Sequence, residues 1–174
     1  KDIGLERKDY ILQTKCGIRD TGKGKWFDFS KEHILNSVDN SLKRLKTEYI
    51  DVFLLHRPDT LVEPLEVAEA FELLKASGKV RALGVSNFSA AQIHTMQRAG
   101  LRPIVNQVQF ALGHTALVDA GFYVNMTADE AVTRSGDTLE YCRAENIALQ
   151  AWSPLQYGFF EGIFIGNEKY PKLN

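Results

Sequence analysis

Short apolar runs and helical patterns alternate along this chain. The clearest run, residues 50–55, is rich in β-preferring residues and has the length of a buried strand. Four further runs of this kind lie at residues 10–14, 80–85, 104–110 and 147–152. Helical patterns follow four of the five runs. Alternating strands and helices predict a parallel sheet, in which functional residues gather at the carboxyl ends of the strands.

Capping residues set the expected limits of the helices. Ser30 suits the start of a helix in which Ile34 and Val38 recur at helical spacing. A second helix is expected from about Pro64 to a C-terminal cap at Gly78. Further starts are expected at a capping box formed by Ser89 and Gln92, and at Asp137 with Glu140.

Two segments fit this alternation less well. Residues 21–25 are polar and glycine-bearing without the spacing of a phosphate loop, which favours a solvated loop. Residues 111–136 show no sustained period and are longer than usual βα connections. They are expected to be an active-site loop or an insertion.

Composition narrows the classes of protein that fit. The chain has 174 residues, 44% of them hydrophobic, which is enough for one packed core. A net charge of -1 leaves no broad basic field for nucleic acid. The two cysteines form neither a metal-binding spacing nor a disulfide framework, and no apolar run approaches the ~20 residues that span a bilayer. We therefore predict a soluble cytoplasmic protein without nucleic-acid or membrane partners, of unspecified oligomeric state.

Each expected strand ends on polar residues. The ends are Thr14-Lys15, Leu55-His56, Ser86-Asn87, Asn106-Gln107 and Trp152-Ser153. Taken singly, a strand-end lysine is usually solvated and a lone histidine usually a hydrogen-bonded core residue. Polar groups repeated at one edge of a parallel sheet indicate a site instead.

In order and spacing, several stretches together resemble the aldo-keto reductase family, closest to its bacterial oxidoreductase branch. They are Leu12–Lys15, Ser41–Leu45, Tyr49–His56, Gly78–Phe88, Asn106-Gln107 and Ala151–Leu155. The resemblance implies an α/β (β/α)8 TIM barrel that binds NADP(H) and reduces a small-molecule aldehyde or ketone. About strands 3–7 of that barrel are expected here, so residues 1–174 are predicted to form a single, partial barrel domain.

The resemblance also implies roles for individual residues. Lys15 and His56 match two members of the catalytic tetrad, the lysine lowering the pKa of a proton-donating tyrosine and the histidine orienting the carbonyl. Ser86, Asn87 and Gln107 match positions that hydrogen-bond the nicotinamide carboxamide, although turn formation and a paired polar core residue are the plain alternatives. Trp152 is expected to stack on the nicotinamide rather than fill the core, and Ser153 and Leu155 to contact the pyrophosphate.

Three features depart from the family pattern. The aspartate and the tyrosine of the tetrad lie upstream of the lysine, and the 14 residues before Lys15 contain no matching motif. Tyr10 lies within the same strand and is not expected to serve as the acid. The segment that grips the adenosine phosphate is also missing, so the sequence alone is expected to be inactive.

Three hypotheses therefore stand. The chain is the central part of a reductase, an NADP(H)-binding regulatory subunit similar to the potassium-channel β-subunits, or an inactive truncated product. Trp26 and Phe27 are expected either to line an aromatic substrate wall or to pack on the surface.

Overall fold

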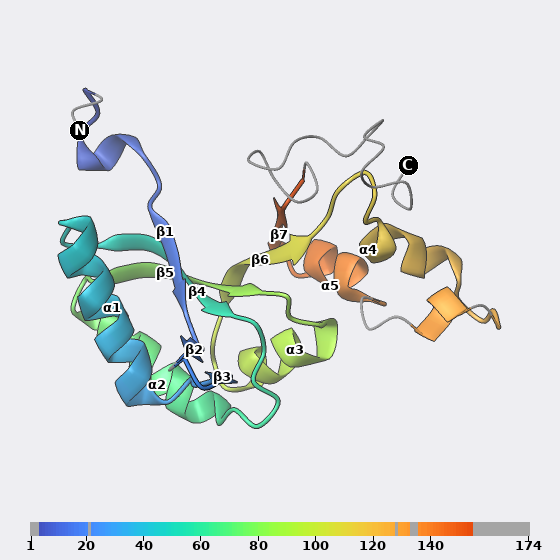
Figure 1. Cartoon of the computed structure of the whole chain (residues 1–174), viewed down its shortest axis with the longest axis horizontal. Helices are drawn as coiled ribbons and strands as arrows, with labels where there is room; N and C mark the ends of the chain where they lie inside the picture. The colour runs from blue at the N-terminus through green and yellow to red at the C-terminus, as the bar shows by residue number, and fades with distance from the viewer. Residues whose placement is uncertain (1–3, 21, 128, 133–135, 155–174) are drawn as a thin grey trace.

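A five-stranded parallel sheet forms the centre of the molecule (Figure 1). The computed structural model describes residues 4–20, 22–127, 129–132 and 136–154. The strand order is β1-β4-β5-β6-β7, and every neighbouring pair is parallel. The strands are β1 Gln13–Cys16, β4 Ile50–His56, β5 Val80–Ser86, β6 Pro103–Gln109 and β7 Ala148–Trp152.

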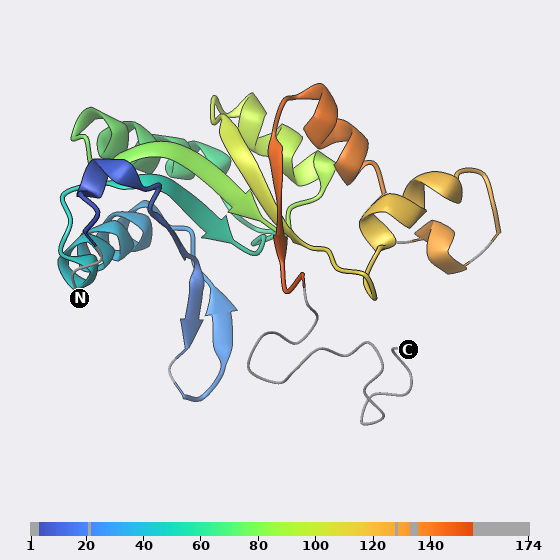
Figure 2. The same ribbon diagram turned by 90° about the horizontal axis from the view of Figure 1, so that it is seen from above.

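Helices α1, α2 and α3 cover one face of this sheet (Figure 1). Helix α5 packs against α3 and β7, while α4 and the turns after it extend beyond that end of the sheet (Figure 2). The helices are α1 Lys31–Leu45, α2 Pro64–Ala76, α3 Ala90–Arg98, α4 Ala116–Asp119 and α5 Thr138–Ala144. Short 3-10 turns lie at Arg7–Asp9, Ala120–Phe122 and Asp129–Val132.

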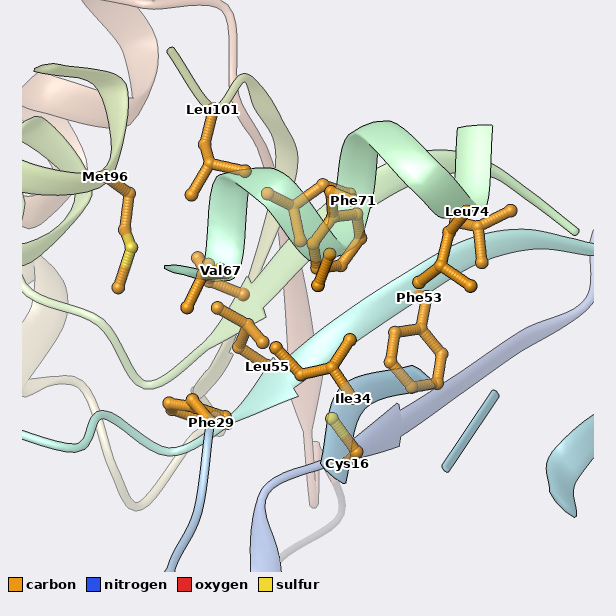
Figure 3. Packing of buried hydrophobic residues seen from close by; sticks show 14 of the residues in the cluster. Cys16, Phe29, Ile34, Phe53, Leu55, Val67, Phe71, Leu74, Met96 and Leu101 are labelled. Atoms are coloured by element: carbon orange, nitrogen blue, oxygen red, sulfur yellow. The ribbon is translucent and has the colours of Figure 1, made fainter. Parts of the chain in front are cut away.

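Side chains alternate between the two faces of each strand. On β4, Phe53 and Leu55 point to the helices, where they join the main core (Figure 3). The helices contribute apolar side chains to that core, among them Ile34, Val38, Val67, Phe71, Leu74, Ile93 and Met96. Val52 and Leu54 point to the opposite face and form a small cluster with Val105. We call that opposite side of the sheet the inner face.

The inner face is concave. Gln13 on the edge strand β1 and Gln150 on the other edge strand, β7, exchange hydrogen bonds of 2.8 and 3.2 Å between their amides. In a flat sheet, strands four places apart lie about 19 Å from each other, beyond the reach of two glutamine side chains. The sheet must therefore curl strongly toward the inner face, as the wall of a barrel does.

The expected strands and helices are present, with limits that differ by a few residues. The first strand begins at Gln13 rather than at Tyr10 and continues through Lys15 to Cys16. Helix α1 is capped by the Ser30 side chain, and α3 begins with the expected Ser89–Gln92 capping box. Helix α5 begins after Asp137 as expected, but the Asp137 side chain makes no capping hydrogen bond.

One element was missed. Strands β2 (Ile18–Asp20) and β3 (Lys25–Phe27) form an antiparallel hairpin, so the loop predicted at residues 21–25 reaches into a strand (Figure 2). Three-residue strands are too short for a periodic signal. In their described part, residues 111–136 contain short helical turns and an isolated β-bridge between Ala111 and His114. No helix in the described residues is long and apolar enough to cross a membrane.

Candidate functional site

A lateral row of polar side chains crosses the inner face near the carboxyl ends of the strands. His56 of β4 is in register with Ser86 of β5, and Ser86 with Gln107 of β6. Gln107 is in turn in register with Gln150 of β7. Lys15 of β1 pairs with Leu54, two positions before His56 and on the same side of the sheet. Parallel pairing therefore brings side chains from five separate segments to one edge.

A chain of hydrogen bonds links the two edges of the sheet through this row. The Lys15 ammonium donates to the Gln107 Oε1 over 2.6 Å, and the Gln107 Nε2 donates to the Gln150 Oε1 over 3.3 Å. Gln150 then bonds to Gln13. Sequence reasoning did not single out Gln13 or Gln150. The available signal was a polar residue at an inner-face position of an otherwise apolar run.

Three basic side chains lie together at the β1 and β4 end of the row. Partial burial lowers the pKa of Lys15, and the charge of Arg57 lowers it further. Burial also lowers the pKa of His56, with added repulsion from Lys15 and Arg57. Both effects favour the neutral imidazole form of His56, which can donate one hydrogen bond and accept another.

The loop after β5 presents amide and hydroxyl groups beside the row. The Ser86 hydroxyl donates to the Gln107 backbone carbonyl over 3.0 Å, and the Asn87 Nδ2 donates to the Ser86 Oγ over 2.8 Å. The Trp152 indole N–H donates to the Asn87 Oδ1 over 2.9 Å. Asn87 has a φ of 62°, a left-handed conformation that asparagine tolerates better than most residues.

Asn106 supports this loop from the core side through side-chain hydrogen bonds to the Phe88 backbone. Its side chain is fully buried, its Nδ2 donates to the Phe88 carbonyl over 2.8 Å, and its Oδ1 accepts from the Phe88 N–H over 3.4 Å. From the sequence, Asn106 was expected only as part of a strand end. A polar residue at a core-facing strand position was the signal that could have identified it, because such groups are almost always hydrogen-bonded.

The structure thus brings Lys15, His56, Ser86, Asn87, Gln107 and Trp152 to one edge of the sheet. Ser153 follows directly, with a φ of 50°, while Leu155 lies outside the described residues. No tyrosine hydroxyl among the described residues bonds to Lys15 or His56. Tyr10 precedes β1 and packs against the Arg7 guanidinium 4.9 Å from its ring centroid.

The sequence of this chain is similar to those of known oxidoreductases. The family model described as Aldo/keto reductase family matches residues 3–173. The uncharacterized oxidoreductase YcsN of Bacillus subtilis is 39% identical over 159 residues, covering 87% of this chain and 48% of that protein. The 6-dehydroglucose reductase of Agrobacterium fabrum is 35% identical over 171 residues, covering 94% of this chain and 52% of that protein.

A solved structure shares the fold. The crystal structure of MGS-M4, an aldo-keto reductase from a Medee basin deep-sea metagenome library, superposes with a TM-score of 0.69 at 29% identity. The match covers 99% of this chain and 54% of that chain. The five-stranded sheet is therefore part of an α/β barrel, as the sequence predicted, and the chain spans about half the length of the relatives it matches.

Proposed function

Because the chain belongs to the aldo/keto reductase family, we propose that its protein reduces aldehydes or ketones to alcohols with NADP(H). The observation that carries this proposal is the row of His56, Ser86 and Gln107 across the inner face, with Lys15 beside it. These are the functional groups that hydride transfer to a carbonyl needs around it: donors for a developing negative charge, and amides that fix a cofactor.

Ser86, Asn87, Gln107 and Trp152 lie at the carboxyl-end edge of the sheet, which we call the rim, and their side chains fit a nicotinamide. A carboxamide offers one acceptor oxygen and two N–H donors, and Ser86, Asn87 and Gln107 offer complementary hydroxyl and amide groups. The half-buried Trp152 adds a flat apolar surface on which an aromatic ring can lie. Ser153 and Leu155 are proposed to contact the cofactor's pyrophosphate. When bound, the cofactor supplies the hydride.

His56 and Lys15 are proposed to act on the carbonyl and its proton. A neutral His56 can donate a hydrogen bond to the carbonyl oxygen, which fixes its orientation and stabilises the charge that builds on it. The Lys15 ammonium lowers the pKa of a hydroxyl proton donor placed beside it, which makes proton transfer near neutral pH easier. Gln107 holds this ammonium at the rim through its Oε1.

Turnover tests the proposal directly. We expect the full protein that contains this chain to oxidise NADPH in the presence of a panel of aldehydes and ketones, followed by the loss of NADPH absorbance. Lys15→Met is expected to lower kcat by at least ~100-fold, the lower limit usual for a group that assists proton transfer. Lys43→Met removes an exposed lysine on α1, far from the rim, and is expected to leave kcat unchanged.

Binding without turnover separates the alternatives. Quenching of tryptophan fluorescence by NADPH, with no aldehyde-dependent oxidation, would favour a cofactor-binding regulatory subunit. Absence of both binding and turnover in a cooperatively folded protein would contradict the assignment. Parallel titrations with NADPH and NADH test the proposed preference for the phosphorylated cofactor.

A further inference from the structure

A pocket of about 480 Å³ opens beside the proposed cofactor rim, on the side of the loops that follow β4, β5 and β6. Asn87 and Trp152 line it on the rim side, and Arg57 stands at the same boundary, its guanidinium 5.8 Å from the centroid of the Trp152 ring. The buried side chains of Val108 and Leu117 are also part of its wall. The pocket is thus roomy enough for a small molecule and adjoins the site of chemistry.

Among the described residues, the polar lining of this pocket is rich in hydrogen-bond donors and includes no carboxylate. Arg57 is its one permanent charge, and among the described residues its guanidinium makes no ion pair or side-chain hydrogen bond. The two acidic residues nearest in sequence to the lining, Asp59 and Asp137, do not line the pocket, and the Asp59 carboxylate accepts the Leu61 N–H instead. In the part of the chain that the structure describes, no carboxylate compensates the positive charge that Arg57 brings to the pocket.

Further hydrogen-bond donors supplement this charge. The His114 imidazole and the Gln109 amide line the pocket, and neither side chain has a hydrogen-bond partner among the described residues. Gln92 uses its Oε1 to accept the Ser89 N–H, so its Nε2 donors remain available to the pocket. An Arg fork with additional N–H donors is the pattern that recognises carboxylates and phosphates.

The geometry points to this pocket as the subsite for an anionic group, a carboxylate or a phosphate, carried by the carbonyl substrate. This inference rests on the proposed function, because the substrate's carbonyl must lie at His56 while its acidic end lies at Arg57. The two residues are adjacent in the chain, and the charge of Arg57 is felt at both His56 and Lys15. Arg57 leaves β4 with a φ of 69°, which turns the chain at this boundary.

Binding of matched probes tests the subsite without requiring turnover. We expect para-carboxybenzaldehyde to bind the protein at least tenfold more tightly than its uncharged methyl ester, measured by calorimetry in the presence of NADP⁺. Arg57→Gln keeps a polar side chain but removes the charge, and it should abolish this difference, whereas Arg57→Lys keeps the charge and should retain part of it. Arg98→Gln, which removes an exposed arginine on α3 that does not line the pocket, should leave it intact.

A second probe distinguishes a carboxylate from a phosphate as the preferred anionic group. A formylphenyl phosphate that binds better than the carboxylate identifies phosphate as the preferred group, and the reverse identifies carboxylate. The inference is overturned if acid and ester bind wild type equally, if folded Arg57→Gln keeps the preference, or if adenosine bisphosphate, the phosphate-bearing half of the cofactor, displaces the acid. In each of these cases NADPH would still be oxidised by uncharged aldehydes, so the subsite would be ruled out while the proposed function stands. Loss of that oxidation would instead count against the proposed function.

Discussion

The support of the loop after β5 by Asn106 gives a prediction whose magnitude follows from the structure. Asn106→Ala removes both hydrogen bonds to Phe88, a residue that is 2% exposed. The Phe88 N–H and carbonyl are then left without partners in the core. Each unsatisfied buried group costs about 1–3 kcal/mol, and the contact of 3.4 Å is the weaker one. We expect the free energy of unfolding to fall by about 2–4 kcal/mol.

Urea unfolding followed by circular dichroism measures this change. The matched control is Asn36→Ala, which removes an exposed asparagine from α1, where alanine is the better helix former and no loss is expected. A loss of 2–4 kcal/mol is a large fraction of the ~5–15 kcal/mol typical of a folded domain. If Asn106→Ala unfolds at the same urea concentration as Asn36→Ala, the loop does not depend on the buried amide.

Two further predictions concern the hairpin that follows Lys15. Burial would raise the pKa of Asp28, but hydrogen bonds from Ser30 and Arg19 outweigh it and lower the pKa to about 2. Its carboxylate thus stabilises the fold above about pH 4 and loses this effect as the pH falls toward 2. The free energy of unfolding of Asp28→Asn should therefore be about 1–2 kcal/mol lower than that of wild type at pH 7 and equal to it in acid. A difference in unfolding free energy that stays constant from pH 7 to pH 2 would contradict this. Gly17→Ala would place a methyl 2.0 Å from the buried Phe29 ring at a φ of 115°, whereas Gly22→Ala meets open space at a φ of 78°. Gly17→Ala should therefore lower the thermal midpoint far more, and equal midpoints would refute the clash.

Most of the fold could be predicted because its strands carry their own signals. The run at residues 50–55 and the capping box at Ser89 depend on neighbours in the sequence, which is what pattern reasoning detects. The hairpin at β2 and β3 could not, because its pairing of Ile18 with Phe27 joins strands of only three residues each. The extension of β1 to Cys16 likewise depends on pairing with β4, which no local pattern encodes.

The arrangement of the candidate site was predictable only in part. Lys15, His56 and Gln107 lie at strand ends, where the resemblance and the parallel topology both direct attention. The bridge from Gln13 to Gln150 depends on the curvature of the sheet, which brings together residues 137 positions apart. The proposed role of Arg57 depends on what surrounds its guanidinium, and a sequence does not show that no described residue forms an ion pair with it.

Binding of reduced nicotinamide mononucleotide tests most directly whether the polar row on the inner face holds the cofactor. This half of the cofactor lacks the adenosine end, so its affinity reports on the rim around Ser86, Asn87 and Gln107. Calorimetry should show binding to wild type and to Asn36→Ala, and at least a tenfold weaker affinity for Gln107→Leu, which keeps the volume but removes the amide. Equal affinity for wild type and folded Gln107→Leu would contradict the assignment of the row as the nicotinamide site.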